Sequence, residues 1–245
     1  MRAAIVIPAR YASTRLPGKL LLRETGKYLI QHTYEAALGS QRASAILIAA
    51  DDDRILDAAA EFGAQAVRTR TDHASGTDRI AEVVGGLKAD VIVNLQGDEP
   101  EADPADIDRL IDALATDKGL GVATLAAESS DAAEHADPNL VKVVVDRRGE
   151  ALYFSRAPIP YDRDAGGTSR FLKHIGIYAY RRKALMEMAE LPVSDLEKTE
   201  RLEQLRALEN GIRVRVILTD HQPVGVDTRA DYDRFAARVA EGAKG

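Results

Sequence analysis

Hydrophobic residues in the first half of the chain form short continuous runs that alternate with helical patterns. The runs at residues 3–7, 45–50, 66–68, 90–95 and 121–126 lack polar alternation, which indicates strands that are buried on both faces. Apolar residues spaced by three and four predict the intervening helices, at residues 29–38, 55–62 and 77–87 and from Asp103 onward. This order predicts an α/β fold with a doubly wound, Rossmann-like parallel sheet, whose ligands bind beyond the carboxyl ends of the strands.

The second half of the chain has a different pattern. Residues 141–145 and 151–154 predict a hairpin with its turn at 147–149, and residues 171–180 predict a further strand. The remaining predicted elements are a helix at 196–208, a strand at 212–218 and a last helix at 229–240. With no repeat and no low-complexity linker, the chain is predicted to form a single domain, residues 1–245, with a mixed-sheet insertion at about 140–210.

Composition narrows the possible functions. The chain has 33 Lys and Arg against 39 Asp and Glu, a net charge of −6, and no cysteine. The absence of cysteine excludes disulfides, thiolate metal sites and a cysteine nucleophile. No apolar stretch approaches the ~18 residues of a membrane span, and the apolar run at the N-terminus is too short for a signal peptide. We therefore expect a cytoplasmic protein that has no membrane partner. We also expect no nucleic-acid partner, because an acidic net charge is unusual for nucleic-acid binders.

A cationic loop follows the first predicted strand. Residues 8–19, PARYASTRLPGK, bring Arg10, Arg15 and Lys19 together with the hydroxyl of Ser13. The loop matches neither the dinucleotide-binding nor the Walker A glycine pattern. Arginine binds phosphate oxygens bidentately and lysine acts as a point charge, so a triphosphate is a suitable ligand for this loop. The alternative from charge alone is a solvated basic loop.

Acidic residues follow two later apolar segments. Asp98 ends the run VIVNLQGD, and Asp227 lies in GVDT before the last helix. Carboxylate oxygens at the end of a strand that faces a phosphate loop suit Mg²⁺, which takes one or two carboxylates together with substrate phosphates. The alternatives are a turn residue for Asp98 and a helix N-cap for Asp227. The acidic residues 51–53 are interpreted as caps and solvated surface.

The segment RTDHASGTDR at residues 70–79 follows the third predicted strand. Ser75, Gly76 and Thr77 begin a predicted helix, where backbone N–H groups and hydroxyls can bind an anion or the edge of a base. The same three residue types are also common as a simple helix N-cap.

Together these segments resemble one family, the CMP-Kdo synthetases or 3-deoxy-manno-octulosonate (Kdo) cytidylyltransferases. The resemblance covers almost the whole chain and follows the order of the family. It rests on the segments IPARYASTRLPGK, RTDHASGTDRIAEV, VIVNLQGDEP, DPNLVKVVVD, ALYFSRAPIPYDRD, KHIGIYAYRR, LEQLRALENG and GVDT. The chain departs from the family pattern where Leu20, Tyr28 and Asp195 replace proline, which restores a backbone N–H at each position.

The resemblance implies a nucleotidyltransferase of glycosyltransferase A-like fold that transfers CMP from CTP to the anomeric hydroxyl of Kdo, with a homodimer as the assembly and residues 140–210 in sugar binding and dimerisation. It assigns to the nucleotide Ala9, Arg10, Ser13, Arg15, Lys19, Arg70, Ser75, Gly76 and Thr77. It assigns to the sugar Gln96, Arg156, His174, Tyr178, Glu203 and Gln204. The residues that it assigns to catalysis are Lys19, Arg10 and the Mg²⁺ ligands Asp98 and Asp227.

Other interpretations of these residues remain open. His174 in a strand pattern is compatible with a structural histidine, Tyr178 with plain core, and the helix that carries Glu203 and Gln204 with a solvated face. Two alternative functions are a non-catalytic nucleotide-binding module and a cytidylyltransferase for a related sugar acid, such as an amino-substituted Kdo or a neuraminate type. The presence of both Asp98 and Asp227 counts against the non-catalytic module.

Overall fold

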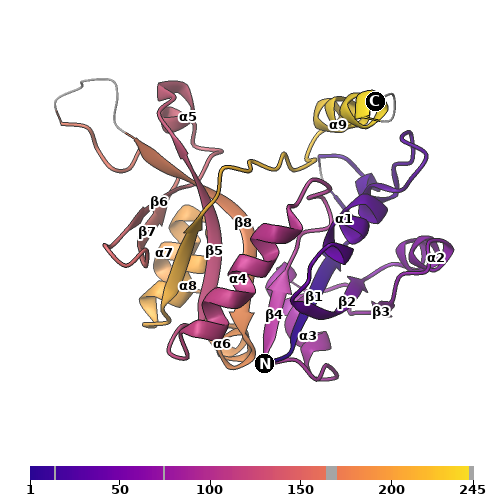
Figure 1. The fold of residues 1–245 in the computed structure, drawn as a ribbon, viewed down its shortest axis with the longest axis horizontal. Helices are drawn as coiled ribbons and strands as arrows, with labels where there is room; N and C mark the ends of the chain where they lie inside the picture. The colour runs from indigo at the N-terminus through magenta and orange to yellow at the C-terminus, as the bar shows by residue number, and fades with distance from the viewer. Residues whose placement is uncertain (14, 74, 164–169, 243–245) are drawn as a thin grey trace. The chain divides into compact units, whose positions relative to one another are not determined.

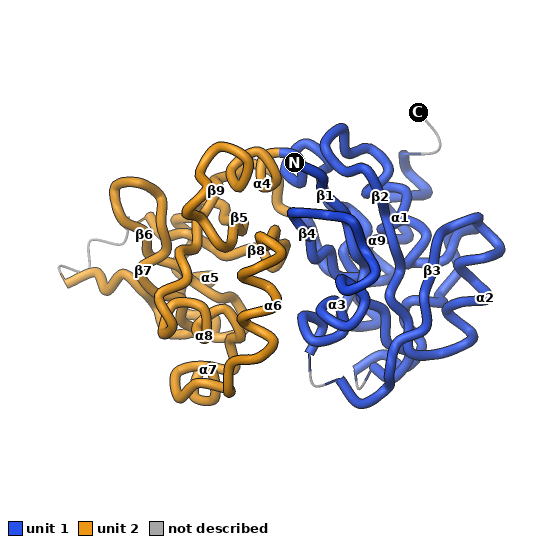
Figure 2. Tube along the Cα trace, turned by 90° about the horizontal axis from the view of Figure 1, so that it is seen from below, with its two compact units in different colours: residues 1–108, 223–245 blue, residues 109–222 orange. Residues whose placement is uncertain are grey.

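The computed structural model describes residues 1–13, 15–73, 75–163 and 170–242. The chain forms two compact units, which Figure 2 shows in different colours. Unit 1 contains Met1–Asp108 and Pro223–Gly245, and unit 2 contains Arg109–Gln222. The first boundary falls within helix α4 (Pro104–Thr116). The second unit thus begins well before the insertion that the sequence pattern predicts at about residue 140.

Unit 1 contains four parallel strands. They are β1 (Ala3–Ala9), β2 (Ala43–Ala50), β3 (Ala66–Arg68) and β4 (Val91–Asn94). Their order is β3-β2-β1-β4, and every neighbouring pair is parallel. Every residue of β1 and β4 is buried, as continuous apolar runs predict. The predicted parallel sheet is confirmed.

Helices connect these strands (Figure 1). They are α1 (Leu29–Leu38), α2 (Asp53–Glu61) and α3 (Gly76–Val84). A short 3₁₀ helix at Lys19–Leu21 precedes α1, and the last helix of the chain, α9 (Arg229–Gly242), also belongs to unit 1. The chain moves outward from β1 to β2 and β3, and then returns past β1 to β4. Because such crossovers are right-handed, α1 and α2 cover one face of the sheet and α3 the other. The winding reverses between β1 and β4, and the carboxyl ends of strands at such a reversal are where ligands bind.

Local sequence explains where these helices begin and end. Asp52 caps α2 by accepting from the backbone N–H of Arg54, and Gly63, with φ +73°, follows the end of that helix. Ser75 caps α3 by accepting from the backbone N–H of Asp78. The predicted capping roles in the 51–53 and 75–77 segments are therefore confirmed for Asp52 and Ser75.

Unit 2 is a mixed sheet with short helices. Its strands are β5 (Val122–Ser129), β6 (Lys142–Val145), β7 (Ala151–Ser155), β8 (Phe171–Arg181) and β9 (Val214–Leu218). β8 is antiparallel to β5 and β6, β6 is antiparallel to β7, and β9 is parallel to β5. The predicted 141–154 hairpin and mixed sheet are confirmed. Residues 164–169, between β7 and β8, lie outside the described residues.

The helices of unit 2 differ from the sequence prediction. The predicted helix at 196–208 is wrong as a single element, because it is divided into α7 (Asp195–Glu200) and α8 (Gln204–Glu209). Arg201, with φ 53°, takes the left-handed conformation that ends α7. Two further helices, α5 (Ala132–Ala136) and α6 (Arg182–Glu190), have no counterpart in the prediction. Among the described residues, no helix is long and apolar enough to cross a membrane.

Candidate active site

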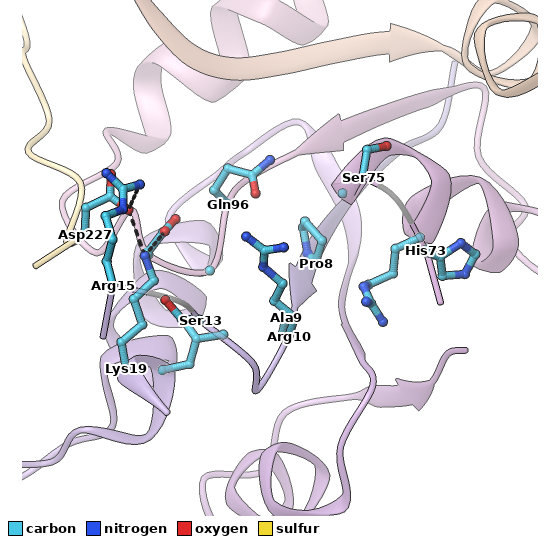
Figure 3. A pocket seen from close by; sticks show the side chains of 15 residues that line it. Pro8, Ala9, Arg10, Ser13, Arg15, Lys19, His73, Ser75, Gln96 and Asp227 are labelled. Atoms are coloured by element: carbon cyan, nitrogen blue, oxygen red, sulfur yellow. Dashed lines mark hydrogen bonds and ion pairs between the residues drawn. The ribbon is translucent and has the colours of Figure 1, made fainter. Parts of the chain in front are cut away.

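A cavity of about 330 Å³ opens in unit 1 at the carboxyl ends of β1 and β4 and at the start of α3 (Figure 3). This volume lies within the range of small-molecule sites. The position is the one that the reversal of strand order predicts. Most of its lining residues are ones that the prediction named: Ala9, Arg10, Ser13, Arg15, Lys19, Ser75, Gly76, Gln96, Asp98 and Asp227.

Lys19 is the central cation of the site. Gly18, with φ +68°, precedes the 3₁₀ turn, and the Lys19 side chain is only 11% exposed. Its ammonium donates to Asp98 Oδ2 at 2.5 Å, to Asp227 Oδ1 at 3.0 Å and to the carbonyl of Val226 at 2.8 Å. An ammonium group has three donors, so all of them are engaged with this acidic site.

The two predicted metal ligands therefore lie together around one cation. The backbone N–H of Val226 donates to the carbonyl of Asp98 at 2.9 Å, which joins the two carboxylate-bearing segments directly. The alternative of a helix N-cap for Asp227 is not what the structure shows: its carboxylate binds Lys19 and Arg15, while Thr228 accepts from the backbone N–H of Asp231 at the start of α9.

A third carboxyl group, which the sequence prediction missed, lies beside this pair. Glu99 Oε2 is shielded from solvent and has no hydrogen-bond partner. Burial, with the nearby charges of Asp98 and Asp227, raises the pKa of Glu99 to about 8. Unlike Asp98, it has no cation bound to it among the described residues. The signal available in the sequence was its place directly after Asp98 at the end of a buried strand.

Two arginines of the cationic loop have different surroundings. Arg15 is 65% exposed at its side chain and pairs with Asp227 at 2.9 Å. Arg10 lines the cavity without a partner among the described residues, and in Figure 3 its guanidinium points into the cavity. Arg10 is exposed, and an unpartnered guanidinium that lines a cavity is available to a phosphate.

The opposite wall comes from β4 and the start of α3. The Gln96 side chain donates to Asn94 at 2.9 Å and lines the cavity of unit 1 together with the residues that the resemblance assigned to the nucleotide, although it assigned Gln96 to the sugar. A Cβ on Gly97 would lie 3.3 Å from both the carbonyl oxygen of Pro8 and the methyl groups of Leu20, so a larger residue here would have to displace these neighbours slightly.

The 70–79 segment contributes to the cavity through two of the four predicted residues and through two residues that were not predicted. Ser75 and Gly76 line it, whereas Arg70 is exposed and Thr77 is buried away from its lining. The lining also includes His73 and Arg79, which the prediction did not name. Both lie in the segment quoted for the resemblance, but nothing in their spacing distinguished them from helix-surface residues.

Arg79 is held rigidly. Its side chain is 5% exposed and pairs with Asp51, itself 11% exposed, at 3.0 Å. It also donates to Thr69 Oγ1 and, at 3.0 Å, to the carbonyl of Arg70. The prediction of solvated surface for Asp51 is therefore wrong, because the fold places an arginine from α3 against the end of β2.

The other predicted sugar residues all belong to unit 2. His174 and Tyr178 lie on β8 with ring centroids 5.4 Å apart, and Phe154 meets His174 edge-on at 5.0 Å. Burial lowers the pKa of His174 to about 3. Burial, with Tyr180 and Glu203 nearby, raises the pKa of Tyr178 well above its usual value.

Arg156 follows β7 and is anchored at one side of its guanidinium. Its Nε donates to the carbonyl of Glu200 at 2.9 Å, and its Nη1 donates to the carbonyl of Pro138 at 3.0 Å. Both acceptors are neutral carbonyls, so the positive charge is not cancelled by these bonds. Nη2 has no partner among the described residues and is available to an anion.

Glu203 and Gln204 do not form a solvated helix face. Gln204 is 7% exposed, and Glu203 lies at the N-terminus of α8, 3.9 Å from the guanidinium of Arg206. The break after α7 turns these residues inward, which a continuous helix at 196–208 did not predict. The structure thus places Tyr178 in ring contact with His174 and within electrostatic reach of Glu203.

The chain is similar over nearly its whole length to proteins of one known family. Residues 4–215 match the cytidylyltransferase family. The chain is 49% identical to a 3-deoxy-manno-octulosonate cytidylyltransferase of Escherichia coli, with 98% of this chain and 97% of that protein covered. It is 48% identical to the protein of the same name in Solibacter usitatus (strain Ellin6076), with 97% and 96% covered. This chain belongs to the 3-deoxy-manno-octulosonate cytidylyltransferases.

The fold agrees with that of the family. A solved structure of CMP:2-keto-3-deoxy-manno-octonic acid synthetase in complex with CTP matches with a TM-score of 0.95 and 48% identity, over 99% of this chain and 100% of that one. The family resemblance and the α/β nucleotidyltransferase fold predicted from the sequence are both confirmed.

Proposed function

We propose that this chain transfers CMP from CTP to the anomeric 2-hydroxyl of Kdo and releases pyrophosphate. The observation that carries the proposal is the cavity of unit 1, where Lys19 is bound between Asp98 and Asp227 while Arg10 remains unpartnered. Family membership supports CTP and Kdo as the substrates. The product is an activated sugar for lipopolysaccharide synthesis, made by a cytoplasmic homodimer.

The cations of the first loop bind the triphosphate. Arg10 binds phosphate oxygens directly, because its guanidinium has no competing partner among the described residues. Arg15 and Lys19 must each exchange a carboxylate contact for a phosphate oxygen when CTP enters. The hydroxyl of Ser13 lies on the same side of the cavity.

The α3 side of the cavity holds the nucleoside. Ser75 and Gly76 lie at the helix N-terminus, where the helix dipole favours acceptors such as a base carbonyl or a phosphate. The Gln96 amide adds a donor and an acceptor on the β4 side. Arg79, whose guanidinium donates a hydrogen bond to Asp51, fixes the position of this wall.

The chemical step is a displacement at phosphorus. The sugar oxygen forms a bond to the α-phosphorus and gives its proton to water. The bond from that phosphorus to the oxygen that bridges the α- and β-phosphates breaks, and pyrophosphate leaves with the electron pair of that bond. Lys19 and Arg10 stabilise the charge that develops on the phosphate oxygens. Orientation of the two substrates supplies much of the remaining rate enhancement.

The acidic residues of the cavity fit Mg²⁺. Asp98 and Asp227 present hard oxygen ligands close together, since both carboxylates contact the same Lys19 ammonium. Glu99 adds a buried oxygen that has no hydrogen-bond partner among the described residues. We propose Asp98 and Asp227 as the metal ligands. When bound, Mg²⁺ supplies charge neutralisation of the triphosphate and acidification of the attacking hydroxyl. The chain's own part is to hold both carboxylates close together, through the Val226–Asp98 backbone bond.

Kdo is bound by residues of unit 2. The available Nη2 of Arg156 suits the carboxylate of the sugar acid. His174 and Tyr178 form an aromatic wall with polar atoms, and Glu203 and the Gln204 amide provide further hydrogen-bonding groups for sugar hydroxyls.

A pyrophosphate-release assay tests the proposal. The four nucleoside triphosphates are crossed with Kdo, its amino analogue and N-acetylneuraminate, with Mg²⁺ present and then removed by chelation. We expect the highest kcat/KM for CTP with Kdo and loss of release without Mg²⁺. If another sugar acid gives a higher kcat/KM than Kdo, that sugar acid is the substrate. If no pair releases pyrophosphate, catalysis is rejected in favour of a binding module.

A further inference from the structure

Thr124 lies where the pairing of two strands of unit 2 is interrupted. It is fully buried in β5. In the register of β5 with β8, Thr124 pairs with Tyr178 and the next pair is Leu125 with Ile175. Two residues of β8 are therefore left over opposite Thr124, and β8 bulges there. Bulges re-aim the side chains near them. Tyr178 lies directly on one side of this bulge, and His174 follows Ile175 on the other side.

The Thr124 hydroxyl meets three polar atoms at this bulge. Its Oγ1 lies 2.9 Å from the carbonyl oxygen of Ile177, 3.2 Å from that of Ile175 and 3.0 Å from Nε2 of His174. A hydroxyl has one proton, and a carbonyl oxygen can only accept. If the proton pointed to His174, two carbonyl oxygens would face hydroxyl lone pairs in a buried site. The hydroxyl therefore donates to the carbonyls and accepts a hydrogen bond from Nε2–H of His174.

This assignment determines the state of the imidazole. Burial keeps His174 neutral, and a neutral imidazole carries its proton on one nitrogen only. With the proton on Nε2, the other nitrogen, Nδ1, is an acceptor. None of the described residues is bonded to Nδ1, and Phe154 and Tyr178 hold the plane of the ring from two sides.

We propose that Thr124 is a positioning residue that holds His174 as its Nε2–H tautomer, so that Nδ1 accepts a hydrogen bond from a hydroxyl of the sugar acid. The inference rests on the proposed function, in which His174 binds the sugar. It adds a specificity rule: a sugar with a donor at that position binds, and one with a deoxy or O-methyl group there does not. Thr124 itself contacts no substrate.

Two substitutions of Thr124 separate its hydroxyl from its volume. Thr124→Val keeps the shape and removes the hydroxyl, and Thr124→Ser keeps the hydroxyl. We expect Thr124→Val to raise KM for Kdo about tenfold, the scale of one lost hydrogen bond in a binding site, with KM for CTP unchanged. Thr124→Ser should restore KM for Kdo. The matched control is Thr116→Val, which removes a hydroxyl that bonds only to the carbonyl of Asp112 in its own helix.

A double variant tests whether Thr124 acts through His174. In a His174→Ala background, Thr124→Val should leave KM for Kdo unchanged, because the group that it positions is absent. An undiminished effect in that background overturns the inference. So does an unchanged KM for Kdo in the single variant, or an equal rise of KM for CTP.

The tautomer is also measurable without any variant or activity. Long-range ¹H–¹⁵N spectra of ¹⁵N-histidine-labelled wild-type protein show which ring nitrogen of His174 carries the proton. We expect Nε2, and a proton on Nδ1 overturns the inference even if Thr124→Val fails to fold. Absence of pyrophosphate release with Kdo in the wild type rejects the proposed function and the sugar contact, whereas the spectrum still decides the tautomer. The two failures are thus distinguishable.

Discussion

His174 is a group whose protonation the fold suppresses, and this makes the stability of the protein depend on pH. Burial lowers its pKa from 6.5 to about 3. The unfolded chain binds a proton at this residue as the pH falls below about 6.5, whereas the folded chain does not. The stabilisation is therefore fully present above the unfolded pKa and is lost as the pH falls toward the folded one.

The size of the effect follows from these values. At pH 4.5 the unfolded imidazole is protonated and the folded imidazole is still neutral. This pH lies about two units below the unfolded pKa, and each unit corresponds to about 1.36 kcal/mol. The free energy of unfolding therefore falls by about 2.7 kcal/mol. As long as the folded pKa lies below 4.5, the size of this loss is set by the unfolded pKa and the pH of the measurement, and not by the exact folded pKa.

Urea denaturation of the wild type and of His174→Gln, each at pH 7.5 and pH 4.5, measures this loss. Glutamine keeps an amide N–H that can donate to Thr124 but does not titrate. All other titrating groups are common to both proteins and cancel in the difference. We expect the wild type to lose about 2.7 kcal/mol more than the variant between the two pH values. An equal loss in both proteins refutes the inference that His174 is neutral in the fold.

Four further predictions concern the two units. Lys19→Met should lower kcat of pyrophosphate release about 10²–10³-fold, the scale of one preorganised charge-stabilising group; less than tenfold at saturating substrates contradicts its catalytic role. Asp98→Asn should abolish pyrophosphate release while circular dichroism stays unchanged, and wild-type turnover would remove Asp98 from the metal site. Arg79→Met should lower the free energy of unfolding by about 3–5 kcal/mol, because it leaves the charge of Asp51 buried and unpaired; an unchanged urea midpoint would show that this pair contributes nothing. His174→Ala should raise KM for Kdo far more than KM for CTP, and equal changes would place His174 outside the sugar site.

Short-range pattern was sufficient for much of the fold and for the position of the cavity in unit 1. Continuous apolar runs predicted the buried strands of unit 1, and the rule for doubly wound sheets placed the cavity at their carboxyl ends. Arg10 and Lys19 were predictable because their chemistry and their loop are both local. The single helix predicted at 196–208 was wrong because a left-handed residue such as Arg201 leaves no mark in hydrophobic periodicity.

The sequence by itself thus determined the order of strands and helices, the family, and the segments that carry the cations and carboxylates. The tertiary structure alone decided which of these residues meet: Asp51 with Arg79, Asp98 with Asp227 around Lys19, and Thr124 with His174 across a bulge. The physical reason is that periodicity and residue type are properties of neighbours in the chain. Pairing between distant residues depends on strand order, register and burial, which only the folded chain sets.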